Sequence, residues 1–296
     1  MPYLIYASSD SINVKFIKCY LSEHAATLTK AKAKTTFKYL AQCSKKERWG
    51  ALDPATMTFK QMCKYVLYRR SQGLGTRSIQ NETSIIRRAL AAVGRRDFAQ
   101  VTCSNNALEV GVGTRKGTGK VVDPHVLHDA LENALPNTKA MIGLSRYLGL
   151  RIREAVKANN SLGDWHKALS LGRPIIVRDG TKGGKARSVV IAPKFQNEAL
   201  EAITLGLKVL ETQNYLVVSK NLKSAVGQHS DRLARLGLKG KNSCHSLRRA
   251  FALDQFLHYL SIGHSEKTAL SWTSNDLGHG DTRGRWIMNN YIKNSL

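Results

Sequence analysis

The sequence has few acidic residues, no long apolar run and no membrane-targeting signal. Only 21 aspartate and glutamate residues accompany 46 lysine and arginine residues, so the formal net charge is +25. No segment approaches the roughly 18 consecutive apolar residues that a membrane-spanning helix needs, and neither a signal-peptide core nor a lipidation signature is present. We therefore expect a cytoplasmic protein without membrane contacts.

The cysteines are also sparse, and their spacing excludes two kinds of site. Five are present, an odd number, and no two form a C-x-x-C pair. This pattern indicates neither a disulfide framework nor a zinc site, and it is typical of thiols in a reducing cytoplasm. We expect the five side chains to be small buried hydrophobes.

Basic residues are abundant in both halves of the chain. Residues 1–120 contain 21 basic and 7 acidic side chains, and residues 121–296 contain 25 and 14. A hydrophobic fraction of 42% argues against a disordered basic tail, and 296 residues are enough for two domains with cores of their own. A folded protein that contacts nucleic acid with both halves is the natural interpretation.

The first half is predicted to be helical. Apolar residues at helical spacing occupy residues 58–70, and a second helix begins near Thr76. Lysines alternate with small residues from Lys30 to Lys38, which predicts a weakly ordered start. Arginines gather toward the ends of the two helices, where we expect phosphate contacts; they are Arg69, Arg70, Arg87, Arg88, Arg95 and Arg96.

Residues 108–122 contain four glycines and no helical stripe, so they are predicted to link two domains. Arg115, Lys116 and Lys120 of this linker could follow a DNA backbone. Asp123 followed by Pro124 is typical of a helix start and opens the second domain. The predicted division is thus a helical DNA-binding domain at 1–107, a linker at 108–122 and a catalytic domain at 123–296.

The second domain is predicted to contain helices at about 124–135 and 138–148, and again beyond Pro193. Between them, two short β-type runs at 175–177 and 187–191 flank a glycine-rich turn, which is a hairpin signal. Lys182 lies at the tip of that hairpin. A further short β-type run occupies residues 215–218.

Two pairs of polar residues could carry chemistry. Arg151 and Glu154 are three residues apart, so on a helix the carboxylate lies beside the guanidinium; this could equally be a surface ion pair worth ~0–1 kcal/mol. His245 and Arg248 share one helical face at a helix start, a place that favours anions. A histidine that merely caps the core is the simpler reading of that second pair.

Taken in order, these motifs resemble the tyrosine recombinases, also called phage-type integrases. The resemblance covers the whole second domain, and the basic first half is similar to the family's core-binding domain. The matching motifs are Gly149–Glu154, the lysine hairpin Thr181–Arg187, His245–Arg248, Leu277–His279 and the terminal Tyr291.

The resemblance implies a mainly α fold with a small β-hairpin in the C-terminal domain: an all-α core-binding domain and a mixed α+β catalytic domain form a two-domain, C-shaped DNA clamp. It also implies strand exchange without metal or other cofactor. Tyr291 would attack the scissile phosphate, Arg151 and Arg248 would hold its oxygens, and Lys182 would protonate the leaving oxygen. His245 would act on the tyrosine proton, His279 would donate a further hydrogen bond, and Glu154 would orient Arg151.

The activity expected from this resemblance is site-specific recombination, through a 3′-phosphotyrosyl intermediate and a Holliday junction, that integrates or excises a mobile element. The resemblance also implies a bacterial protein associated with the nucleoid. The expected partners are double-stranded recombination sites, three further copies of the chain in a tetramer on DNA, and accessory DNA-bending or directionality proteins. The alternatives are an enzyme that cuts and reseals DNA alone, like a type IB topoisomerase, and a DNA-binding module with decayed catalysis.

Overall fold

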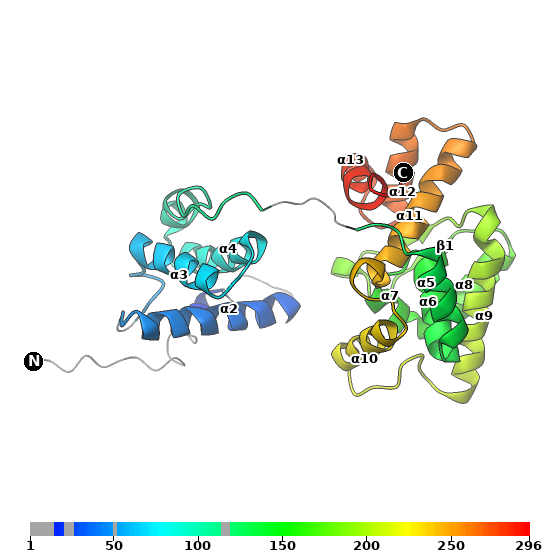
Figure 1. Cartoon of the computed structure of the whole chain (residues 1–296), viewed down its shortest axis with the longest axis horizontal. Coiled ribbons are helices and arrows are strands. Elements are labelled where there is room, and N and C mark those ends of the chain that lie inside the picture. Colours follow the sequence, from blue (N-terminus) through cyan, green and yellow to red (C-terminus); the bar gives the residue numbers. More distant parts are fainter. Residues whose placement is uncertain (1–14, 21–26, 50–51, 114–118) are drawn as a thin grey trace, which may run out of the picture. The chain divides into compact units, whose positions relative to one another are not determined.

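The computed structural model describes residues 15–20, 27–49, 52–113 and 119–296, and the chain divides into two compact units, 1–115 and 116–296 (Figure 1). The division falls inside the predicted linker, 108–122. Each unit has its own hydrophobic core, and in the described residues no helix is long and apolar enough to cross a membrane.

The described part of the first unit is helical. Its main elements are α2 (Thr27–Lys46), α3 (Phe59–Ser71), α4 (Thr76–Ala92) and a π-helical turn (Phe98–Thr102). The start of α3 is set by a capping box, in which the Thr58 side chain accepts from Gln61 N and the Gln61 side chain accepts from Thr58 N. The predicted helices at 58–70 and from Thr76 are confirmed.

The prediction of a weakly ordered segment from Lys30 to Lys38 is wrong, because these residues lie within α2. One face of this helix is buried in the core of the unit through Ala33, Phe37, Leu40 and Ala41. The lysines occupy the opposite, exposed face. Alternating lysines concealed the helical period of the few apolar residues between them.

The described ends of the predicted linker are packed rather than free. Leu108 and Val110 are buried in the core of the first unit, and Gly111 O accepts a hydrogen bond from the Gln80 side chain at 2.8 Å. On the other side of the undescribed residues, Val122 is buried in the second unit. Backbone and apolar contacts thus fasten each end to its own unit.

The second unit is mostly helical. In chain order it contains α5 (Pro124–Asn133), α6 (Pro136–Tyr147), α7 (Ile152–Val156), α8 (Leu162–Ser170), α9 (Gln196–Thr212), α10 (Leu222–Arg235), α11 (Cys244–Ser261), α12 (Glu266–Asp276) and α13 (Gly284–Ile287), with a π-helical turn at Met288–Ile292. Asp123 caps α5 by accepting from His125 N and Val126 N, with Pro124 in the first turn. The helix start predicted from Asp123 and Pro124 is confirmed.

The predicted hairpin is present as a two-stranded antiparallel sheet. Strand β1 (Ile175–Val177) pairs with β2 (Arg187–Val189), and Ile175 lies opposite Val189. The indole of Trp165 on α8 donates to Ile176 O at 2.8 Å. The mainly helical fold with one small sheet, expected from the sequence, is confirmed.

The β-type run at 215–218 does not form a strand. Its buried residue Leu216 makes its backbone hydrogen bonds with side chains instead: Leu216 N donates to Asn159 Oδ1 at 3.1 Å, and Leu216 O accepts from Asn137 Nδ2 at 3.0 Å. These two asparagines satisfy the backbone groups that a strand partner would otherwise bond.

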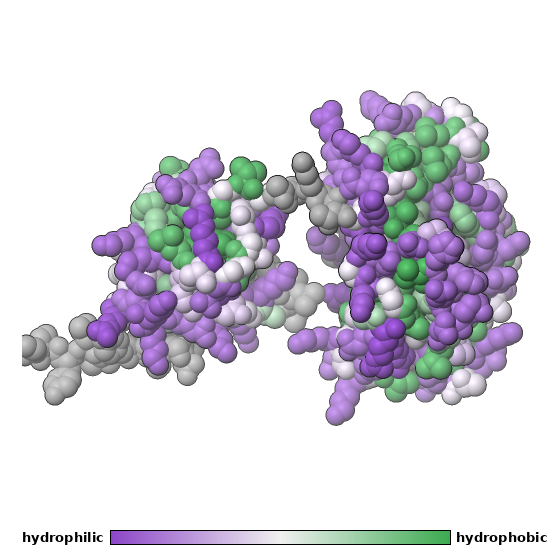
Figure 2. Space-filling view, in the orientation of Figure 1, coloured by the Kyte–Doolittle hydropathy of each residue, from purple (hydrophilic) through white to green (hydrophobic). Residues whose placement is uncertain are grey.

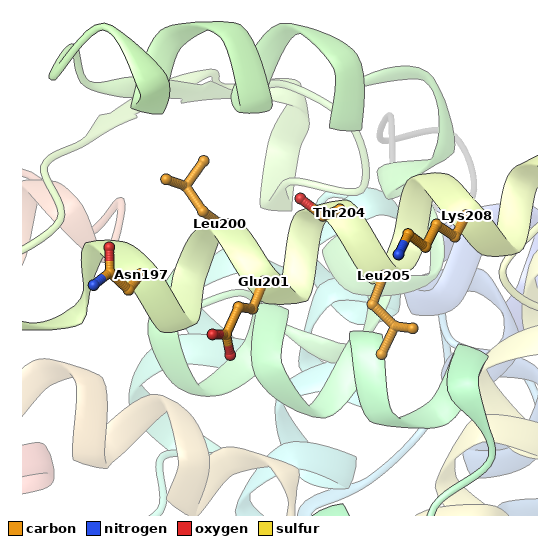
Figure 3. A pocket seen from close by; sticks show the side chains of 6 residues that line it. All are labelled: Asn197, Leu200, Glu201, Thr204, Leu205 and Lys208. Atoms are coloured by element: carbon orange, nitrogen blue, oxygen red, sulfur yellow. The ribbon is translucent and has the colours of Figure 1, made fainter.

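Hydrophilic side chains cover most of the visible face of each unit, and hydrophobic side chains show only in smaller areas (Figure 2). A hollow along α9 is lined by six side chains of that helix, Asn197, Leu200, Glu201, Thr204, Leu205 and Lys208 (Figure 3). None of the candidate catalytic residues contributes to this hollow.

One buried histidine makes the stability of the second unit sensitive to pH. His229 on α10 is fully buried, and neither ring nitrogen has a hydrogen-bond partner among the described residues. Burial, with the charge of Arg232, lowers the pKa of His229 to about 4. An unfolded chain therefore binds a proton between about pH 6.5 and 4 that the folded chain does not, so stability falls as pH falls through this range.

We predict that His229→Leu will reduce the stability lost between pH 7 and pH 5 by about 2 kcal/mol, since each pKa unit corresponds to roughly 1.4 kcal/mol. Urea unfolding of the full chain at both pH values measures this. The matched control is His128→Leu, at an exposed position of α5, which should leave the pH dependence as in the wild type. If His229→Leu loses as much stability between pH 7 and pH 5 as the wild type, His229 is not the source of the pH dependence.

Candidate active site

Arg151 lies at the N-terminus of the short helix α7, where Glu154 fixes it. Glu154 Oε2 accepts from Arg151 N at 2.7 Å, and Oε1 accepts from Arg151 Nη1 at 2.8 Å. The side-by-side placement expected from the three-residue spacing is confirmed, but the pair is no surface ion pair because the Glu154 side chain is fully buried. Gly149 has a φ of +62°, and a Cβ there would lie 2.4 Å from the Phe251 ring, so the chain needs glycine before α7.

Glu154 also pairs with two further arginines. Arg187 of β2 donates through Nη1 and Nη2 to the two carboxylate oxygens, each at 2.7 Å, and Arg248 Nη1 lies 3.9 Å from Glu154 Oε2. Burial alone would raise the pKa of Glu154, but the hydrogen bonds and charge of Arg187 and the charge of Arg248 lower it to about 2. Three guanidinium groups thus surround one carboxylate, which leaves an excess of positive charge.

Arg248, on the first turns of α11, is almost completely buried. Its Nη1 donates to Gly149 O and its Nη2 to Leu277 O, while Nε has no partner among the described residues. Arg151 Nη2 donates to the same Leu277 oxygen at 3.2 Å. The two arginines therefore converge on one acceptor, and burial lowers the pKa of Arg248 to about 10, still well above neutrality.

Tyr291 lies beside two histidines. Its hydroxyl is 3.5 Å from His279 Nε2, and its ring packs edge-on against His245 with 5.3 Å between centroids. Burial and neighbouring arginines lower the pKa of His245 to about 4 and that of His279 to about 3. At neutral pH both imidazoles are therefore uncharged, so a neutral histidine able to accept a proton lies beside the tyrosine, with His279 Nε2 facing its hydroxyl.

The segment between His279 and Tyr291 is folded back in three short turns. A 3-10 turn (Asp281–Arg283), the one-turn helix α13 and the π-helical turn at Met288–Ile292 follow one another. Trp286 packs at a tilt against both rings, with its centroid 4.7 Å from that of His279 and 5.5 Å from that of Tyr291. Tyr291 is only 3% exposed. Although twelve residues separate them in the sequence, these turns place Tyr291 beside His279.

Lys182 is the candidate residue that the structure does not bring to the others. It begins a short turn, Lys182–Gly184, at the exposed tip of the hairpin. Among the described residues it has no hydrogen-bond or ion-pair partner. Gly183 and Gly184 both have φ above +70° and open space around them. The hairpin therefore presents the ammonium group to solvent, whereas Arg151, His245, Arg248, His279 and Tyr291 are gathered in one place.

Sequence reasoning missed Arg187 as a site residue. It is 8% exposed, and besides Glu154 it bonds Asp276 O through Nε at 2.9 Å. A signal was present: residues 187 and 189 lie on the same face of a strand, and Val189 is apolar and fully buried. A charged residue on that inward face needs a buried counter-charge.

In the first unit, three of the arginines expected on DNA are buried or half-buried and make contacts within the protein. Arg69 is 5% exposed and bonds Glu82 at 2.8 and 3.0 Å. Arg95 donates to Pro54 O and Met57 O at 2.9 and 2.7 Å, and Arg87 donates to Cys103 O at 3.4 Å. The expectation overlooked Glu82 and the backbone carbonyls within reach of these side chains. We therefore leave Arg69, Arg87 and Arg95 out of the DNA contacts proposed below.

The remaining basic candidates are exposed or lie outside the described residues. Arg70 is exposed and donates to Glu109 O. Arg88, Arg96 and Lys120 are exposed. Arg115 and Lys116 lie outside the described residues. Because these side chains are exposed, a DNA phosphate can reach them, and their contact with DNA stays a prediction.

The titratable side chains of the described residues do not cluster as the ligands of a metal ion would. Over the described ranges no group of three or more histidine, cysteine, aspartate or glutamate side chains could hold a metal ion. The site instead offers converging guanidinium donors, two neutral imidazoles and a buried phenol. Such an arrangement can bind a phosphate-like anion and present an oxygen nucleophile to it.

Residues 109–254 match the family model described as Integrase. This match, over 146 of the 296 residues, supports the tyrosine recombinase family, with DNA recombination as the class of activity. A comparison with curated protein sequences gives no match.

Solved structures of integrases share the fold. The Tn1549 transposon integrase in complex with a circular intermediate DNA is 15% identical, with a TM-score of 0.58 over 94% of this chain and 95% of that one. A lambda integrase dimer bound to a COC′ core site is 16% identical, with a TM-score of 0.56 over 95% and 77% of the two chains. A lambda integrase tetramer bound to a Holliday junction is 15% identical, with a TM-score of 0.53 over 91% and 76%.

We predict that Glu154→Gln will destabilise the protein by about 3–5 kcal/mol, because it leaves buried guanidinium groups without a counter-charge. Chemical denaturation of the full chain measures the change. Glu132→Gln is the control, since Glu132 is largely exposed and 3.8 Å from Lys139; it should cost no more than ~1 kcal/mol. Equal effects of the two substitutions would refute the central place given to Glu154.

Proposed function

We propose that this protein is a site-specific DNA recombinase that cleaves and rejoins strands through a covalent link to Tyr291. The observation that carries the proposal is the convergence of Arg151 and Arg248 on one point beside Tyr291 and two neutral histidines. Fold and family match support the same class. In the proposal the scissile phosphate binds beside the Leu277 carbonyl oxygen that both guanidinium groups bond, and its oxygens accept hydrogen bonds from Arg151 and Arg248.

In the first step, the Tyr291 oxygen attacks phosphorus while the bond from phosphorus to the 5′ oxygen breaks. His245 accepts the tyrosine proton, and Lys182 supplies a proton to the leaving oxygen. The products are a 3′-phosphotyrosyl link and a free 5′-hydroxyl. Arg151 and Arg248 stabilise the charge on the non-bridging oxygens, and His279 donates a further hydrogen bond.

The second step runs in the reverse direction. A 5′-hydroxyl from a partner strand gives its proton to Lys182 and attacks the phosphotyrosine. The bond from phosphorus to the tyrosine oxygen breaks, and His245 returns the proton to that oxygen. Because the phosphodiester is exchanged for a phosphotyrosine and back, no ATP or metal is required. This proposal includes a tetramer on two DNA sites and a Holliday junction between two rounds of exchange, as the lambda integrase assembly suggests.

The duplex is contacted by basic side chains of both units. On the first unit the exposed arginines Arg70, Arg88 and Arg96 are the proposed phosphate contacts, and Lys120 is the contact from the segment before α5. A contact of this type releases counterions from DNA, so affinity depends on salt but not on base sequence.

We predict that Tyr291→Phe will abolish the covalent protein–DNA adduct and leave DNA binding intact. The substrate is a nicked duplex whose short fragment diffuses away after cleavage, so that the adduct accumulates; the duplexes are tiled across the DNA that flanks the coding region. The assay contains EDTA. Tyr215→Phe is the matched control, because Tyr215 is 56% exposed and outside the site, and it should form the adduct like the wild type. An adduct formed by Tyr291→Phe, or no wild-type adduct on any flanking duplex in EDTA, would sink the proposed function.

We also predict that the double variant Arg88→Ala/Arg96→Ala will bind DNA with a weaker salt dependence. Loss of two phosphate contacts should lower the slope of log affinity against log salt by about 1.8. Fluorescence anisotropy from low to moderate salt gives the slope. Gln100→Ala removes an exposed uncharged side chain of the same unit and should keep the wild-type slope; a double variant with that same slope would remove these arginines from the interface.

A further inference from the structure

Two buried polar side chains that the proposed mechanism does not use join the hairpin to the helices of the site. Gln255 and Asp276, on α11 and α12, are 1% and 5% exposed. Asp276 Oδ1 accepts from Val190 N at 3.2 Å. Gln255 Nε2 donates to Val190 O at 2.6 Å, and Gln255 Oε1 accepts from Ala192 N at 3.0 Å. The backbone just beyond β2 is thus bonded to side chains where a third strand would otherwise pair.

The two side chains are also bonded to each other and to Tyr259. Gln255 Nε2 lies 3.1 Å from Asp276 Oδ2, and the Tyr259 hydroxyl donates to the same oxygen at 2.7 Å. The main-chain oxygen of Asp276 accepts from Arg187 Nε at 2.9 Å. Every one of these groups is enclosed, so each bond fixes the relative position of the elements it connects.

The same short segment leads directly into the site. Leu277, the residue after Asp276, carries the carbonyl on which Arg151 and Arg248 converge, and His279 follows two residues later. On the other side of the connection, β2 leads back to the turn that carries Lys182. The base of the hairpin is further held at Gly180, where a Cβ would lie 2.5 Å from Arg153 O. Among the described residues, the tip (Lys182–Gly184) makes no hydrogen bond outside the hairpin.

We propose that Asp276 and Gln255 are positioning residues for Lys182. By holding the backbone after β2 against α11 and α12, they set where the exposed ammonium group stands relative to Arg248 and His279. They touch neither the phosphate nor the nucleophile. This inference rests on the proposed function, in which Lys182 protonates the leaving 5′ oxygen.

The test uses a substrate in which the scissile 5′ oxygen is replaced by sulfur. A thiol is a much stronger acid than an alcohol, so a thiolate leaves without being protonated. A defect in delivering the Lys182 proton therefore disappears on the sulfur substrate, while a defect in fold, DNA binding or phosphate contact remains. The readout is the ratio of single-turnover cleavage rates, sulfur over oxygen, which does not depend on the fraction of folded protein.

We expect Asp276→Asn to slow cleavage of the oxygen substrate by about 10- to 100-fold and to cleave the sulfur substrate within about threefold of wild type, since a misplacement near 1 Å has costs of this size. The ratio should approach that of Lys182→Ala. Tyr259→Phe removes only the hydroxyl that bonds Asp276, so it preserves the packing and should raise the ratio by a smaller factor. It keeps the test decisive if Asp276→Asn folds poorly.

Asp254→Asn is the matched control. This neighbour of Gln255 on α11 pairs with Arg146 at 2.7 Å and Lys194 at 3.7 Å, with no bond to Val190 or Ala192, and its ratio should equal that of the wild type. A wild-type ratio in both Asp276→Asn and Tyr259→Phe, with Lys182→Ala raised, would overturn the positioning role alone. An unchanged ratio in Lys182→Ala would overturn it together with the acid role of Lys182, and an adduct in Tyr291→Phe would overturn the proposed function itself.

Discussion

The buried carboxylate of Glu154 is the group on which the arrangement of the candidate active site depends. Its oxygens bond Arg151 and Arg187 and lie near Arg248. Without it, three guanidinium groups would repel one another in a place that excludes water, and burial of an unpaired charge costs several kcal/mol. With it, they converge and still leave positive charge for an anion. Glu154 therefore holds three arginines in place with a single negative charge. The net positive charge that remains favours binding of a phosphate.

Three elements around the site, α7, β1 and β2, are short, so their positions come from hydrogen bonds that connect them to the rest of the unit. Helix α7 has five residues and each strand has three. Elements of this length are not stable by themselves. Trp165 of α8 bonds β1, Gln255 and Asp276 bond the backbone beyond β2, and Glu154 bonds the backbone at the start of α7. Arg151 lies at the start of α7 and is held by Glu154, while Lys182 lies at the tip of the hairpin, which none of these bonds holds directly.

Local patterns in the sequence predicted well where the physics is local. The helix starts at Thr76 and Pro124, the hairpin around Lys182 and the pairing of Arg151 with Glu154 all follow from spacing over a few residues. Errors arose where a distant partner decides the outcome. Arg69 and Arg96 look alike in the sequence, yet Arg69 meets Glu82 on the next helix and Arg96 stays exposed. The run at 215–218 has strand-forming residues but lacks a partner strand.

The amino-acid sequence alone therefore specifies the helical class, the single hairpin, the basic charge and the residue types available for chemistry, because these depend on counts and on periods of two or 3.6 residues. Tertiary packing alone specifies which of those residues meet. Arg187 reaches Glu154 across 33 residues, and Arg151 reaches the Leu277 carbonyl across 126. No short-range pattern encodes such distances, since they depend on how α7, β2, α11 and α12 fill one core.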